Sequence, residues 1–138
     1  MELELAYWKD DGLWRDRWKE QQLFLVVAGS PEAPAAANVA TLRDVMSRWP
    51  EVQETIATYV RGLASGEHVP LRQADLGGFA AGTCGFDQKL SFDAIRVIDL
   101  SAPRRVCVWF YTGYPDGYAT YEVTLDDGVP TEIRAFAS

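Results

Sequence analysis

The residues best suited to nucleophilic chemistry are two cysteines and a single histidine. A catalytic thiol needs a base that takes its proton, so any Cys–His pair would have to use His68. His68 and Cys84 both belong to an irregular, glycine-rich segment that begins at Glu67 and ends at Lys89. No recognisable spacing requires them to pair, and an ordinary loop histidine is the simpler interpretation. A small enzyme or ligand-binding domain that uses this loop remains the alternative hypothesis.

Part of the same segment resembles a phosphate-binding loop. Gly77 and Gly82 have the spacing of a P-loop, but Thr83 stands where that motif needs a lysine. The dinucleotide-binding pattern GxGxxG is absent from the sequence, and Cys84 and Cys107 match no zinc-ligand spacing. We therefore expect no cofactor and no metal site, and we expect both thiols to be free, as in a reducing compartment.

Two pairs of carboxylates occur in Asp-Asp-Gly sequences. Asp10 and Asp11 precede one glycine, and Asp126 and Asp127 precede another. Such triplets are typical of tight turns between strands. General acid–base catalysis usually needs a carboxyl group whose pKa is raised by burial, whereas turn tips are wet. One tip also supplies too few oxygen ligands for calcium.

Aromatic side chains concentrate near the expected turns, and Trp and Tyr are enriched in protein-binding hot spots. Three tryptophans crowd the first hairpin, and four tyrosines surround the turn at Pro115. Most of these rings are expected in the core or over the sheet. Together with the acidic tips, the others predict an acidic and aromatic rim that binds a partner: Asp10, Asp11, Trp14, Asp116, Tyr118, Asp126 and Asp127.

The element around which the chain is organised is residues 104–112, where six apolar or aromatic residues follow one another. Its β-branched and aromatic content favours a strand over a helix. Alternate side chains of a strand point to opposite faces, and both faces here are apolar. We therefore expect this strand to be central and covered on both sides.

The remaining patterns predict one α+β domain spanning residues 1–138. Alternating apolar residues and turn signals first predict three strands. Two helices follow, because apolar residues there recur at three- and four-residue spacing, and Pro50 separates the two helices. Four strands complete the order βββ-αα-ββββ. Because the turns are short, we expect an antiparallel sheet with the two helices packed on it. The strands are expected at 2–8, 13–19, 23–27, 95–100, 104–112, 118–125 and 129–136 and the helices at 35–49 and 50–65; residues 71–76 are a further candidate for a short helix.

Composition narrows the class of partner. The formal net charge is −7, which disfavours nucleic acid as a partner and fits a basic protein, although acidity alone also keeps a protein soluble. No apolar run reaches the roughly 20 residues needed to span a bilayer. The N-terminal residues lack the pattern of a signal peptide. We therefore expect a cytoplasmic protein without membrane association.

Several features occur in order along most of the chain: Tyr7-Trp8, Leu13-Trp14, Trp49-Pro50, residues 90–95 and the hairpin from Trp109 to Gly128 with Tyr114, Pro115, Asp116, Gly117 and Tyr118. In this plan, the chain resembles small bacterial domains of unknown function that are linked to polymorphic-toxin systems as immunity proteins. The resemblance implies a non-enzymatic domain that binds and blocks a toxin encoded beside it.

A subunit that self-associates through a sheet edge or an aromatic face is the remaining hypothesis, and we expect a monomer or weak dimer.

Overall fold

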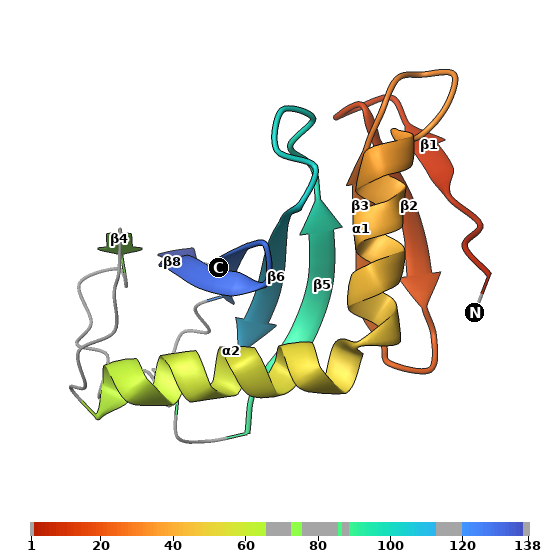
Figure 1. Cartoon of the computed structure of the whole chain (residues 1–138). Helices are drawn as coiled ribbons and strands as arrows, with labels where there is room; N and C mark the ends of the chain where they lie inside the picture. The colour runs from red at the N-terminus through yellow and green to blue at the C-terminus, as the bar shows by residue number, and fades with distance from the viewer. Residues whose placement is uncertain (1, 66–72, 76–85, 87–88, 113–119, 137–138) are drawn as a thin grey trace.

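The computed structural model of the chain places two helices on one side of a broad sheet (Figure 1). It describes residues 2–65, 73–75, 86, 89–112 and 120–136. The helices are α1 (Ala36–Ser47) and α2 (Trp49–Ala64). The strands are β1 (Ala6–Trp8), β2 (Leu13–Trp18), β3 (Leu23–Ala28), β4 (Gln73–Asp75), β5 (Ser91–Val97), β6 (Arg105–Tyr111), β7 (Thr120–Asp126) and β8 (Val129–Phe136).

The sheet is mixed, so the expectation of an antiparallel sheet is wrong. Its strand order is β1-β2-β3-β5-β6-β7-β8-β4, and β3 runs parallel to β5, as β4 does to β8. Short turns make the hairpin neighbours antiparallel, but β3 and β5 are connected through both helices. A crossover of that length lets two adjacent strands run in the same direction.

The predicted order of three strands, two helices and four strands is confirmed, with the short strand β4 added between α2 and β5. β4 lies where the sequence suggested a short helix at 71–76, so that suggestion is wrong. β5 begins at Ser91, whereas the expected strand begins at Ile95. A β-bulge between Phe92 and Ala94 interrupts the pairing with β6, and this irregularity hides the start of the strand from a search for strict alternation.

The predicted break between the two helices is present, but it lies at Arg48, and Trp49, expected to end the first helix, instead begins the second. α1 ends at Ser47, and α2 begins at Trp49 with Pro50 in its first turn, where a missing N–H is harmless. Trp49 is buried at this corner, with its ring 6.5 Å from that of Trp18 and 5.2 Å from that of Phe92. The corner therefore anchors both helices to the sheet.

The core lies between the helices and one face of the sheet. α1 packs on β3 and β5, and α2 packs on β8. The amide of Asn38 in α1 is buried and donates hydrogen bonds to the carbonyl oxygens of Val97 (3.2 Å) and Asp99 (3.1 Å). The largest fully buried side chains are Tyr121, Phe86, Phe110, Leu23, Leu25, Leu42, Ile56, Ile95, Ile133, Val27, Val60 and Val97.

β6 is central in the sheet, as predicted, but its two faces differ. Val106, Val108 and Phe110 are buried on the helix side. On the opposite side Cys107 and Trp109 are only partly buried, and Tyr111 is 42% exposed. The expectation that β6 is covered on both sides is therefore wrong, because neither helix lies on that second face (Figure 1).

Candidate functional site

The two Asp-Asp-Gly turns lie at the same end of the sheet. Asp10 and Asp11 precede the start of β2, and Asp126 and Asp127 lie at the end of β7. The strand pairings show that the start of β2, the ends of β3 and β5, the start of β6 and the end of β7 are neighbours at this end of the sheet. We call it the turn end. Part of the predicted rim is therefore assembled there.

Three of the four turn carboxylates are paired with arginines. Arg15 donates to Asp11, Arg104 lies 2.6 Å from Asp127, and Arg105 lies 2.8 Å from Asp126. The hydrogen bond from Arg15 holds the pKa of Asp11 below its usual value. Pairs at or near the surface are individually weak, but these three balance negative charge with positive charge at the turn end. The rim is therefore less acidic than the sequence indicates.

Trp14 belongs to the supporting structure of this end. Its indole Nε1 donates a 2.9 Å hydrogen bond to the carbonyl oxygen of Ser30, in the link between β3 and α1. Its ring lies 5.4 Å from that of Tyr7 on the neighbouring strand. Trp14 is half-buried, and it ties the first hairpin to the start of the helical crossover.

The remaining predicted residues lie outside the described part of the chain. These are Asp116 and Tyr118 of the rim and His68 and Cys84 of the alternative hypothesis. Tyr111 ends β6 and Thr120 begins β7 at the end of the sheet opposite the turn end.

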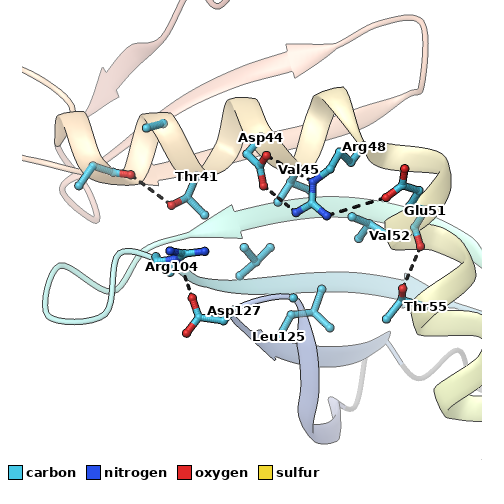
Figure 2. Close-up of a pocket in the computed structure, with 14 residues that line it drawn as sticks. Thr41, Asp44, Val45, Arg48, Glu51, Val52, Thr55, Arg104, Leu125 and Asp127 are labelled. Carbon is cyan, nitrogen blue, oxygen red and sulfur yellow. Dashed lines mark hydrogen bonds and ion pairs between the residues drawn. The ribbon is translucent and has the colours of Figure 1, made fainter.

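A groove of about 450 Å³ lies between the helices, the start of β6 and the end of β7 (Figure 2). Apolar side chains such as Val45, Val52 and Leu125 form its floor. Its rim carries two charged groups, which are the ion pair Arg104–Asp127 and the cluster in which Arg48 lies 2.6 Å from Asp44 and 3.9 Å from Glu51. The hydrogen bond from Arg48 lowers the pKa of Asp44. Each arginine of this rim therefore has a carboxylate partner, and neither offers an unpaired positive charge to a ligand.

The face of the sheet opposite the helices carries a different arrangement, which we call the open face. Leu23, Leu25 and Val27 of β3 are buried on the helix side, so Phe24 and Val26 point away from the helices. The registers place polar and aromatic side chains of neighbouring strands beside them. The open face comprises Trp8, Arg15, Arg17, Phe24, Val26, Ala94, Arg96, Cys107, Trp109, Tyr111, Glu122, Thr124, Glu132 and Arg134.

Three arginines of the open face lie over aromatic rings. The guanidinium carbon is 4.7 Å from the ring centre for Arg15 over Trp8, 4.6 Å for Arg17 over Phe24 and 4.5 Å for Arg96 over Trp109. Such stacking is attractive because the ring face carries negative charge density. Trp8 is 53% exposed and Phe24 is 48% exposed, so these stacks are accessible from water.

Arg15 and Arg17 lie two residues apart in β2, so both fall on one face of the strand, and this alternation with Trp14 and Trp18 is visible in the sequence. The partners on β1, β3 and β6 are defined only by strand register, so the stacks were not predictable from local sequence.

A polar network lies beside the third stack. The indole Nε1 of Trp109 donates to Oε2 of Glu122 (2.6 Å), and Arg134 donates to Oε1 of the same carboxylate (3.0 Å). The Glu122 side chain is only 6% exposed, so this carboxylate is held by two donors in a largely dry place. Burial lowers the pKa of Arg96 and raises that of the Cys107 thiol.

Comparisons with known proteins identify no relative: no family model matches the chain, and no match is found among curated proteins or solved structures. Among the described residues, no three His, Cys, Asp or Glu side chains gather as metal ligands. No helix in that part of the chain combines the length and apolar character of a membrane span.

Proposed function

We propose that this chain is a non-enzymatic protein-binding domain that inhibits a bacterial toxin encoded beside it. The observation that carries the proposal is the open face, where exposed aromatic rings alternate with arginines on a rigid sheet. Trp, Tyr and Arg dominate binding hot spots because they supply large contact areas together with directional hydrogen bonds. The plan-level resemblance to immunity proteins supports a toxin as the partner.

The net charge of −7 favours a partner that is basic overall. Opposite net charges accelerate encounter, and this acceleration decreases as salt screens the charges. The carboxylates of the turn end, although paired with arginines, lie in exposed turns where a basic partner can compete for them. The proposed complex therefore combines long-range attraction with short-range contacts on the open face.

The proposal is tested by purifying the tagged full-length chain from its native host at low salt and identifying any protein recovered in stoichiometric amount. That protein is then expressed alone and together with this chain in a heterologous bacterium. We expect arrested growth in the first case and restored growth in the second. A recovered partner whose expression is harmless, or whose toxicity persists during co-expression, contradicts the inhibitor function.

A further inference from the structure

Two arginines of the open face differ from the other arginines near the sheet. Arg15, Arg104, Arg105 and Arg134 all form ion pairs with carboxylates. In the described part of the chain, Arg17 and Arg96 have no such ion pair, although both guanidinium groups are positioned over rings. The Glu122 carboxylate favours the charged form of Arg96 from a distance, but no described carboxylate contacts either guanidinium group, so both can accept an external anion.

The strand register places these two arginines on the strands that flank β3, with the Arg17 guanidinium over Phe24 and the Arg96 guanidinium over Trp109 of β6. Arg17 is the cross-strand partner of Phe24, and Arg96 is paired with Val26, two residues further along β3. β2 and β5 flank β3, so their backbones lie about 10 Å apart. A segment of extended chain laid on Phe24 can therefore present acidic side chains to both guanidinium groups.

The chemistry of both sites fits carboxylates. A guanidinium group forms two parallel hydrogen bonds with a carboxylate, and stacking on a ring keeps its plane defined. Arg96 is partly buried, and its burial disfavours the charged form of the side chain. An anion bound there would offset this cost, because opposite charge favours the charged form.

We propose that the open face binds an acidic segment of the partner protein, with Arg17 and Arg96 contacting its carboxylates and Phe24 contacting its apolar part. This inference rests on the proposed function, and it adds the chemistry of the contact. A partner that is basic overall and carries one acidic segment is attracted by the net negative charge of this chain and can also contact the two arginines of the open face.

The observations favour a protein segment over nucleic acid. A nucleic acid presents a continuous row of phosphates, and its affinity depends on several cations that displace counterions. Here two unpaired guanidinium groups belong to a chain of net charge −7, whose carboxylates would repel a long polyanion. A short acidic segment concentrates its charge where the two arginines lie.

The test uses the full-length chain and a fluorescein-labelled peptide of alternating glutamate and leucine as the probe, with binding followed by anisotropy at low salt. We expect saturable binding that weakens about tenfold in Arg17→Gln and further in Arg17→Gln/Arg96→Gln, since lost hot-spot contacts have effects of this size. Arg43→Gln, which changes an exposed arginine of α1, is the matched control and is expected to bind like the wild type.

Three outcomes would overturn the inference: no binding of the peptide by the wild type, equal weakening by Arg43→Gln, or tighter binding of a single-stranded oligothymidylate with the same dependence on Arg17. Arg17 is exposed, so its variant is expected to fold, and circular dichroism checks this. Because the probe is defined, this result is independent of the recovery of a toxin. Peptide binding without a recovered toxin would contradict only the inhibitor function.

Discussion

At the scale of single residues, the molecule repeatedly neutralises its carboxylates with arginines. Asp11, Asp126 and Asp127 were expected to face a partner, yet each contacts an arginine of its own chain. Exposed pairs of this kind contribute little to stability, so their main effect is on the charge that a partner meets. Glu122 is the exception, because its carboxylate is buried.

Replacement of Glu122 by alanine is expected to lower the free energy of unfolding by about 2–3 kcal/mol. The reason is that the Trp109 indole N–H and the Arg134 guanidinium would lose a charged acceptor in a largely buried place. Urea denaturation followed by fluorescence measures the change. Glu132→Ala, on the neighbouring strand, is the control and is expected to shift stability by about 0.5 kcal/mol or less. Equal effects of the two substitutions would contradict the importance of this network.

At the scale of elements, two connections position the functional surfaces. The link from β3 to α1 reverses between Ser30 and Ala33, whose backbone groups share a 2.9 Å hydrogen bond, and Gly29 beside this turn forms an isolated bridge with Pro34. The loop from β5 to β6 is organised by Asp99, whose carboxylate accepts hydrogen bonds from the backbone N–H and the hydroxyl of Ser101. Both connections belong to the turn end, and each allows one local prediction.

Gly29→Ala is expected to destabilise the protein by about 1–3 kcal/mol, as overpacking does elsewhere. A Cβ atom at this position would lie 2.5 Å from the carbonyl oxygen of Ala33 and 2.6 Å from the Cα of Pro34, and both are backbone atoms that cannot rotate away. Thermal unfolding measures the effect. Glu32→Ala tests the same loop at an exposed position and should leave the melting temperature nearly unchanged.

Acidification is expected to weaken the β5–β6 loop. The hydrogen bond from the Ser101 hydroxyl holds the pKa of Asp99 below its usual value, so the unfolded chain binds its proton first as pH falls. The stability that this carboxylate contributes is present above its unfolded pKa of about 3.9 and is lost as pH falls through the lower folded pKa.

The measurement is the urea midpoint of unfolding as the pH is lowered from about 5 to about 2, the range over which depressed carboxyl groups titrate. The midpoint of the wild type is expected to fall. Asp99→Asn should make this fall shallower, and Ser101→Ala should reproduce part of that change. An acid dependence that is identical in all three proteins would show that Asp99 contributes nothing.

At the scale of the whole molecule, the two faces of the sheet have separate tasks. The helix side forms the hydrophobic core, while the open face exposes Trp8 and Phe24 with arginines stacked on them. Substitution of these exposed rings is therefore expected to affect binding more than folding, unlike substitution of the buried Glu122 on the same face. Phe24 lies at the centre of the proposed contact, so its substitution best separates an effect on binding from an effect on stability.

Phe24→Ser is expected to reduce recovery of the partner about tenfold, as loss of a binding hot spot does, while changing stability by about 1 kcal/mol or less because the ring is already half-exposed. Quantitative pull-down measures the recovery of the partner, and urea denaturation of the same variant measures the free energy of unfolding. Val129→Ser removes a similarly exposed apolar side chain at the turn end and is the control. Undiminished recovery with Phe24→Ser would place the contact elsewhere.

The sequence by itself determined the features that depend on neighbours along the chain. These include most strand positions, the presence of a helix break near Pro50, the Asp-Asp-Gly turns and the central place of β6, because side-chain period, proline geometry and turn propensity act locally. Local patterns could not reveal the parallel pairing of β3 with β5, since that pairing joins residues separated by two helices.

Only the tertiary structure decided which face of β6 stays open and which arginine meets which ring or carboxylate. Such contacts depend on strand register, which changes the neighbours of every side chain with each shift by one residue. The described part of the predicted rim is less acidic for this reason, since Arg104 and Arg105 approach Asp127 and Asp126 across a strand pair. The stack of Arg96 over Trp109 arises in the same way from the pairing of β5 with β6.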